Sequence, residues 1–527
     1  MKRSGKWNYQ SICRGMNTLA VGVVKGVGAA LFVVLTWYSL RYTQYMIPDP
    51  LGDEIPINAP DSMLGNLLFL ILSVAVFKGL FVLEKRLSPR LQQVIMGIAL
   101  ALPVLLVGIG GAWWITALDR QPVWDQAQLV SAASCFMEGD YSYLAREAYC
   151  GSCPHQLGQV ALLEILFRVV GPYNYFACQV LLVVLAVGIV LLGFALVRCI
   201  AEHMAVAVSY CLLMLTCIHL ICYTGWIYGD LPSIFFILLA AVSLLCYTRK
   251  GKLRWLAVMV VACIFALLVR KNSILVLIAL CLVAGIHALS RKDKRLMVAV
   301  LLAAVLPNLA YTGIFKMYEY RSGIEHSEGF SNISYIAMGM QEYMGKCGWY
   351  TFYCNNTYHD SGFDTALAEE ISKQDIRKRL EEFKENPSMA VNFYREKLLS
   401  QWNAPLYQAM YFGAAYAEGI RPEPDSLLAR MNEEYFPGIL QVCNRVHFFI
   451  FVGMLFYFLF AVRKNGNMAQ HLLAVTIIGG FFFSIIWEAK ARYIFPYYIT
   501  MFPLAVVGYS RCLEALEVFL RGRIKSR

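Results

Sequence analysis

Apolar runs of about 17–25 residues recur along the whole chain, and they restrict its fold more than any other feature. Each run is long enough to cross a hydrocarbon core of ~30 Å as a helix. Of the 527 residues, 59% are hydrophobic and only 15% are charged, which excludes a soluble protein with charged domain surfaces. The alternating pattern of a barrel strand is absent from the sequence. We therefore predict an all-α polytopic membrane protein.

We predict about twelve transmembrane helices, with helical loops on the outer side of the membrane. Their approximate ranges are 22–40, 63–83, 94–118, 173–197, 203–224, 230–247, 254–270, 273–289, 296–316, 440–461, 468–487 and 491–510. The sequence shows no internal repeat.

Basic residues gather in four short gaps between the apolar runs and indicate the orientation. Together these gaps hold thirteen Lys and Arg residues; they are 84–90, 248–254, 291–295 and 463–466. The gap at 47–61 instead carries four acids and no base. Because cytoplasmic loops are rich in Lys and Arg, we expect both termini to be cytoplasmic and segments 119–172 and 317–436 to be extracytoplasmic. The net charge of +11 follows this topology, so we predict no nucleic-acid partner.

We divide the chain into three segments. Residues 1–316 form a transmembrane module with a functional outer loop at 119–172, residues 317–436 an extracytoplasmic and mainly helical region, and residues 437–527 the last spans with a basic cytoplasmic tail. Within the middle segment, the sequence predicts an amphipathic helix over 363–387 and a second helix over 387–402, where Pro387 occupies the first turn. We expect a multi-pass protein of the plasma (cytoplasmic) membrane.

Three groups of charges lie at outer span boundaries, where charge is costly and usually functional. Asp119 and Asp125 open the 119–172 loop. The basic groups are Arg270 with Lys271, and Lys490 with Arg492 beside Glu488; these residues break the positive-inside rule, so an outer-side anion would explain both groups. Ordinary alternatives remain, because such bases can be snorkelling anchors and the acids can be a span end and a helix N-cap.

The segment 124–170 carries too many charges for a lipid-exposed span, so we predict helices that lie along the outer membrane face. Glu164 and Arg168 have the i,i+4 spacing of an ion pair on one such helix. Cys150 and Cys153 form either a local disulfide or two free thiols. Asp230 either caps a helix or belongs to an aromatic, acidic patch that could hold sugar hydroxyls.

Five short motifs occur in order over most of the chain: 119-DRQPVWDQAQ-128, 154-PHQLGQ-159, 227-IYGDLPS-233, 270-RKNS-273 and 488-EAKARYIFPYYITMFP-503. In this order they resemble the C-type (GT-C) glycosyltransferases that use polyprenyl-phosphate sugars, in particular the bacterial branch similar to protein O-mannosyltransferases. The resemblance implies a GT-C-like fold that transfers a sugar, with inversion, from the lipid donor to an extracytoplasmic acceptor. That acceptor would be an envelope glycan, teichoic acid, lipid or protein.

The resemblance also implies roles for particular residues. Asp125 matches the loop acid that acts as general base, and Arg270, Lys490 and Arg492 suit the donor phosphate. Candidates for contact with the sugar or the acceptor are Asp119, His155, Gln156, Tyr228, Asp230 and Glu488. No metal and no cofactor is expected, and membrane lipids are the remaining partners. If the two basic groups bind one phosphate, their charged ends should face one cavity together with Asp125.

The sequence departs from the family in two places. Asp119 and Asp125 are six positions apart, whereas relatives often place the two acids close together, so the choice of base stays open between them. The C-x-x-C pair of Cys150 and Cys153 before Pro154 is not expected of the family. Separately, 113-WW-114 is not followed by the acid of the signature typical of oligosaccharyltransferases. Two other functions are kept as alternatives: a transporter or flippase of lipid-linked glycans, and a polymerase or ligase of such glycans. Twelve spans suit a transporter equally, but the lack of a repeat and the long outer segments favour an enzyme.

Overall fold

The computed structural model describes residues 9–48, 54–118, 121–413, 426–463 and 467–525. Ten helices of this described chain are long and apolar enough to cross a membrane. They are α1 (Tyr9–Arg41), α2 (Met63–Glu84), α3 (Pro89–Leu118), α7 (Tyr175–Ile200), α10 (Asp230–Lys250), α12 (Ile274–Arg291), α13 (Lys294–Ser322), α20 (Phe436–Phe456), α21 (Leu472–Ile486) and α22 (Ala491–Lys525), where α12, α20 and α21 are counted with the adjoining short turns. The chain is therefore a helical, multi-pass membrane protein.

The two remaining predicted spans differ from a simple helix. The predicted span 203–224 consists of α8 (Met204–Met214) and α9 (Ile218–Cys222), which are bent by 53° at a short break. The predicted span 254–270 is α11 (Leu253–Val269), an apolar helix of 17 residues that is shorter than the ten spans. The described chain thus supports ten long spans, or eleven with the bent pair.

Helices of the first and third predicted segments form one bundle. Helix α1 packs against α20, where the rings of Phe32 and Phe451 lie 5.5 Å apart, and α22 packs against α7, α8, α10 and α20. Helix α13 continues to Ser322, past the predicted boundary at residue 316. The segments 1–316 and 437–527 therefore pack together, and the division of the chain at 316 and 437 stays a prediction.

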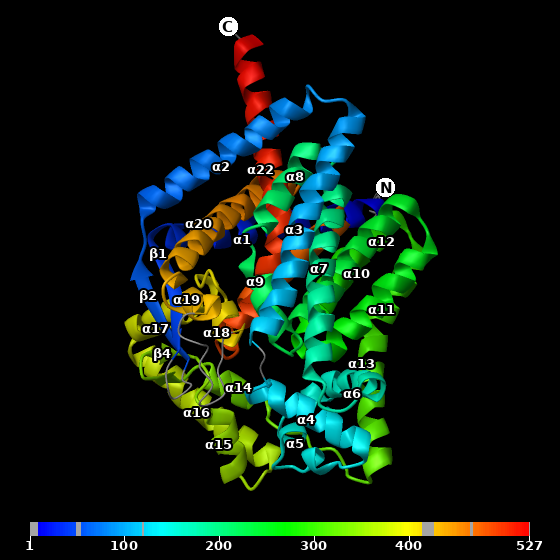
Figure 1. Ribbon diagram of the computed structural model, residues 1–527, viewed down its shortest axis with the longest axis vertical. Coiled ribbons are helices and arrows are strands. Elements are labelled where there is room, and N and C mark those ends of the chain that lie inside the picture. The colour runs from blue at the N-terminus through cyan, green and yellow to red at the C-terminus, as the bar shows by residue number, and fades with distance from the viewer. Residues whose placement is uncertain (1–8, 49–53, 119–120, 414–425, 464–466, 526–527) are drawn as a thin grey trace, which may run out of the picture.

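Shorter helices gather at one end of the bundle, which we call the loop end. They are α4 (Trp124–Glu138), α5 (Tyr149–Ser152), α6 (Leu157–Val170), α14 (Asn332–Met338), α15 (Tyr353–Asp360), α16 (Thr365–Glu385) and α17 (Pro387–Trp402). Figure 1 shows these helices opposite the α2–α3 connection and the C-terminal end of α22. The predicted inner gap 84–90 and the tail thus lie together, as the predicted topology requires. The compartment that each end faces stays a prediction.

The two predicted helices of the middle segment are confirmed as α16 and α17. Asp364 caps α16 by accepting hydrogen bonds from the backbone N–H groups of Ala366 and Leu367 at 2.8 and 3.1 Å. Asn386 caps α17, and Pro387 stands in its first turn. Helices α18 (Ala409–Gly413) and α19 (Leu427–Asn432) complete this region.

A β-hairpin occupies part of the gap that the sequence indicated as a plain acidic loop. Strands β1 (Tyr42–Pro48) and β2 (Glu54–Pro60) pair antiparallel. The hairpin that they form extends toward the loop end in Figure 1. Gln44 donates a backbone hydrogen bond to Asn403 at 3.1 Å, which docks the hairpin on the end of α17. A second, very short ladder joins β3 (Glu342–Tyr343) and β4 (Lys346–Cys347). These two short ladders are small additions to a helical chain, which agrees with the predicted all-α class.

Candidate functional site

A cavity of about 1090 Å³ opens at the loop end, between the shorter helices and the ends of the spans. Its wall combines five segments that are far apart in the sequence, together with Glu54 and Tyr411: residues within 124–156, 226–228, 269–275, 328–355 and 483–493. Eight of the ten predicted site residues line it, namely Asp125, His155, Gln156, Tyr228, Arg270, Glu488, Lys490 and Arg492. The structure therefore brings both basic groups and the loop acid to one cavity.

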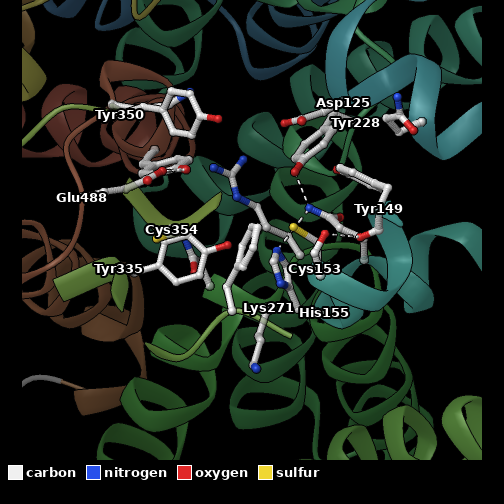
Figure 2. A pocket seen from close by; sticks show the side chains of 18 of the residues that line it. Asp125, Tyr149, Cys153, His155, Tyr228, Lys271, Tyr335, Tyr350, Cys354 and Glu488 are labelled. Atoms are coloured by element: carbon white, nitrogen blue, oxygen red, sulfur yellow. Dashed lines mark hydrogen bonds between the residues drawn. The ribbon is translucent and has the colours of Figure 1, made fainter. Parts of the chain in front are cut away.

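The acid Asp125 lies in the first turn of α4 and faces the cavity (Figure 2). Val123 holds the N-cap position, so the alternative that Asp125 is an N-cap is wrong. No hydrogen bond or ion pair engages its carboxylate within the described chain. Trp124 before it adopts a left-handed backbone with φ of 52°, a strained conformation that such bulky residues rarely occupy. The acid is thus available to a ligand.

Two glutamines hold the wall next to this acid. Gln126 Oε1 accepts a hydrogen bond from the Ile227 backbone N–H at 3.0 Å, which ties α4 to the segment before α10. Gln156 donates a hydrogen bond to the hydroxyl of Tyr228 (Figure 2). Burial raises the pKa of Tyr228 well above its usual value, so its hydroxyl keeps its proton. Gln156 and Tyr228 therefore position each other in the wall.

Arg270 lines the cavity and forms an ion pair with Asp230. Asp230 is 1% exposed and does not line the cavity, and its second carboxylate oxygen has no hydrogen-bond partner in the described chain. Asp230 thus acts as the counter-ion that orients Arg270, a role that the sequence did not indicate. Arg270 also lies 5.7 Å from the centre of the Tyr493 ring.

The other two cations lie beside aromatic rings. Lys490 pairs with Glu54 of β2 at 3.3 Å and lies 4.7 Å from the centre of the Tyr350 ring. The Arg492 guanidinium lies 4.7 Å from the centre of the Tyr228 ring. Arg492 is 3% exposed, so it faces the cavity from within the protein rather than from a lipid-exposed surface. This burial contradicts the snorkelling alternative for Arg492.

Glu488 forms the wall opposite Asp125 and Tyr228, next to Tyr350 (Figure 2). Burial raises the pKa of Glu488 above its usual value, although Lys490 and a hydrogen bond from Tyr493 oppose the shift. The two carboxyl groups therefore meet the cavity in different environments. One of them lies in a partly open helix turn, and the other lies in a fully covered segment.

His155 and the thiols of this region are uncharged near neutral pH. Burial, with Lys271 nearby, lowers the pKa of His155 to about 4. Burial raises the pKa of Cys153 to about 12, with Asp125 as a further cause. Cys150 and Cys153 are separate thiols, which excludes the alternative of a local disulfide in this structure. Within the described residues, no group of three or more His, Cys, Asp or Glu side chains could hold a metal ion.

Aromatic side chains that the sequence did not single out form much of the remaining wall. Tyr335 stacks on Trp487 at 5.0 Å, and Trp124 stacks on Tyr411 at 5.9 Å. Burial keeps the pKa of Tyr149 and Tyr335 well above the usual value, so both hydroxyls remain proton donors. Such rings with hydroxyl groups suit a ligand that is apolar on one face and polar at its edge.

Asp119 is the one predicted site residue that lies outside the described residues. The comparison between Asp119 and Asp125 therefore rests on Asp125 alone. Comparison of the chain with known proteins found no matching family model, no matching curated protein and no matching solved structure. The function must therefore be argued from the cavity itself.

Proposed function

We propose that the protein is a membrane glycosyltransferase that moves a sugar from a polyprenyl-phosphate donor to an envelope acceptor. The observation that carries the proposal is the meeting of Asp125 with Arg270, Lys490 and Arg492 around one cavity at the end of a membrane bundle. A lipid phosphate needs cations near the membrane boundary, and an acceptor hydroxyl needs a base. The cavity supplies both, and its volume suits a sugar headgroup.

In this mechanism the acceptor hydroxyl lies next to Asp125. As its oxygen attacks the anomeric carbon of the donor sugar, the proton moves to the Asp125 carboxylate. The bond between the anomeric carbon and the phosphate oxygen breaks, and the electron pair leaves with polyprenyl phosphate. The sugar is transferred with inversion because the attack comes from the face opposite the leaving group.

The cations stabilise the phosphate as charge develops on its leaving oxygen. Arg270 is held in place by Asp230, so its guanidinium is oriented before the donor binds. Lys490 and Arg492 reach the same cavity from the start of α22. A phosphate is a good leaving group, so the mechanism needs a base and cations but no separate general acid.

The direct test uses the purified full-length protein in lipid nanodiscs. Polyprenyl-phosphate donors that carry a labelled sugar are added. Release or transfer of the label is then measured with and without acceptor glycans or lipids. We expect turnover that depends on Asp125 and proceeds without added metal. A protein that binds these lipids but never breaks the sugar–phosphate bond contradicts the proposal.

One observation favours the alternative of a lipid-linked glycan transporter. The span made of α8 and α9 is broken, with a bend of 53°, and broken spans are typical of transporters. The same nanodisc material decides between them when reconstituted into vesicles. Movement of a labelled lipid-linked glycan between leaflets, without any chemical change of the lipid, would establish the transporter instead. A glycan polymerase or ligase would yield chain growth in the transfer assay.

A further inference from the structure

The segment that carries Glu488 is fixed in place on both sides. Ala489 donates a backbone hydrogen bond to the Gly348 carbonyl at 2.7 Å and pairs with Trp349 as a single parallel bridge. On the other side Gly339 approaches the backbone so closely that an added Cβ would lie 2.7 Å from the Trp487 carbonyl carbon. Glu488 therefore cannot shift without displacing the loop-end region.

A buried lysine also holds the segment that carries Glu488. Lys397 of α17 is fully buried, and its amine donates to the carbonyl oxygens of Gly339 and Ile485 at 2.5 and 2.9 Å. These two carbonyls belong to the segments that flank Glu488. The position of the Glu488 side chain is thus set by the protein before any ligand arrives, as a recognition residue requires.

The side chain itself is only half satisfied. Glu488 is 3% exposed, and Oε1 accepts a hydrogen bond from the Tyr493 hydroxyl. Oε2 is buried and has no hydrogen-bond partner in the described chain. No ion pair within the described residues includes Glu488, because the neighbouring Lys490 is engaged by Glu54. A buried carboxyl oxygen that lacks a partner is unfavourable, and a ligand in the cavity can supply the missing bond.

The surroundings restrict the chemistry of that partner. A phosphate oxygen would be repelled by the carboxylate, and an ammonium group would meet the cations Lys490 and Arg492 on the same segment. A hydroxyl group both donates and accepts, so it satisfies Oε2 whether or not the carboxyl holds a proton. Burial raises the pKa of Glu488 above its usual value, and a hydroxyl suits either protonation state of the carboxyl.

We propose that Glu488 Oε2 hydrogen-bonds a hydroxyl of an uncharged donor sugar and thereby determines which sugar the protein accepts. This inference rests on the proposed glycosyltransferase function. Figure 2 shows Glu488 across the cavity from Asp125, so the donor sugar lies between the two carboxyl groups, with the acceptor on the Asp125 side. Glu488 is then a specificity residue of the donor, and it takes no proton in the transfer step.

The test distinguishes the contribution of the sugar to binding from that of the phosphate. Full-length protein in nanodiscs is titrated with decaprenyl methyl phosphate, a sugar-free diester of the same charge, and with decaprenyl-phosphate mannose, glucose, galactose, arabinose and glucosamine. The variants are Glu488→Ala, Glu488→Gln and, as a matched control outside the cavity, Glu396→Gln. Melting temperatures confirm that each variant is folded.

We expect one uncharged sugar lipid to bind wild-type protein more tightly than the methyl diester. Glu488→Ala should weaken binding of this sugar lipid by about 10- to 100-fold, the value of one hydrogen bond to a charged group, and so reduce its gain in affinity over the methyl diester. Binding of the methyl diester should stay unchanged. Glu488→Gln should recover part of the gain, and Glu396→Gln should keep all of it. Synthetic deoxy versions of the preferred sugar should then identify the hydroxyl, because one of them should be insensitive to Glu488→Ala.

Four outcomes overturn the inference while the proposed function stands. In the first, the sugar lipid still binds Glu488→Ala more tightly than the methyl diester does, by the same factor as in wild type. In the second, Glu488→Ala weakens binding of the sugar lipid and of the methyl diester equally. In the third and fourth, the glucosamine lipid binds most tightly, or no sugar lipid binds more tightly than the methyl diester. Failure of the proposed function gives a different result, in which the protein binds none of the lipid phosphates or binds them but never breaks the sugar–phosphate bond in the transfer assay; the inference then falls with it.

Discussion

Two clusters of charged side chains lie at the loop end. They differ in whether the protein itself supplies all hydrogen-bond partners of their carboxyl groups. In the first, which we call the closed cluster, Glu164 of α6 accepts hydrogen bonds from Arg168 at 2.6 Å, from Arg321 at 2.7 and 3.0 Å, and from Tyr318 at 2.8 Å. Both carboxylate oxygens are satisfied there. Among the described residues that surround the cavity, Asp125 has no such partner and the Glu488 carboxyl has only the Tyr493 hydroxyl.

The pKa of Glu164 expresses the same difference. Burial alone would raise it, but the hydrogen bonds from Arg321, Arg168 and Tyr318 outweigh burial and hold the pKa below its usual value. Glu488 has too few partners to reverse the effect of burial, and its pKa stays raised. A cluster that completes its own hydrogen bonds stabilises the fold, whereas one with unfilled bonds is suited to a ligand. Four predictions follow from this contrast, in order of decreasing effect.

Asp125→Asn should lower sugar transfer by about 10²–10⁴-fold, because the side chain keeps its size but can no longer take a proton. The measurement is the initial rate of transfer of labelled sugar in nanodiscs, with donor binding measured in parallel and expected to change little. Asp140→Asn is the matched control, since Asp140 is exposed and bonds the Ser142 backbone at 2.9 Å. If Asp119→Asn abolishes transfer and Asp125→Asn does not, the role of base passes to Asp119.

Arg270→Ala should weaken donor binding by about 10- to 100-fold, because a charge-assisted contact to the phosphate is lost. It should also lower the melting temperature, since Asp230 is then buried without its counter-ion. The double variant Asp230→Ala, Arg270→Ala separates the two effects. We expect it to recover melting temperature but not donor affinity. Recovered affinity in the double variant would mean that Arg270 is structural, like the closed cluster.

Glu164→Gln should reduce the free energy of unfolding by about 1–3 kcal/mol, because Arg168 and Arg321 lose their shared anion. Transfer per folded molecule should remain close to wild type. Thermal unfolding in detergent and the nanodisc rate assay measure the two quantities separately. A loss of transfer without a loss of stability would show that the closed cluster takes part in function and would remove the contrast between the clusters.

The smallest effect concerns pH. The pKa of His155 is about 4 in the folded protein, below the value of ~6.5 for an unperturbed His, so the unfolded chain binds more protons between these values. Stability should therefore fall as pH decreases through this window, and His155→Gln should remove that part of the fall. Melting temperatures at pH 7, 6 and 5 measure it. Parallel curves for wild type and variant would show that His155 gains access to water or an anion in solution.

The meeting of distant charges in one cavity could be predicted from the sequence. Arg270 and Arg492 stand at the ends of apolar runs, and alternation of the runs places both at the same side of the bundle. The loop after the third span places Asp125 at that side as well. These inferences need only the length of a span and the count of crossings, so they hold without knowledge of side-chain packing.

Other parts of the site could not be found in this way. Tyr335 and Tyr350 belong to a polar segment without periodicity, and only tertiary packing brings them to the cavity wall. The pair of Asp230 and Arg270 joins two span ends forty residues apart, a separation that no local rule predicts. Pro56 and Pro60 made β2 look like a loop, because proline is disfavoured within strands.

The broken span gave no warning in the sequence either. The apolar run over α8 and α9 contains no Gly or Pro before Gly225, so it read as a continuous helix. The break is a consequence of packing, since His219 of α9 contacts the Pro405 carbonyl oxygen at 2.7 Å and Tyr223 bonds the Tyr407 carbonyl oxygen at 2.7 Å. Segments near residue 405 thus shape a helix nearly two hundred positions earlier.

The spread of the cavity wall along the chain sets the order in which the protein can be assembled. The wall runs from Glu54 to Tyr493, so it is incomplete until the last span, α22, has left the ribosome and entered the bilayer. Until then Asp125 of α4 faces a cavity that lacks Arg492. Insertion of α22 therefore completes the cavity wall. A chain truncated before α22 lacks Arg492 and Tyr493 from that wall.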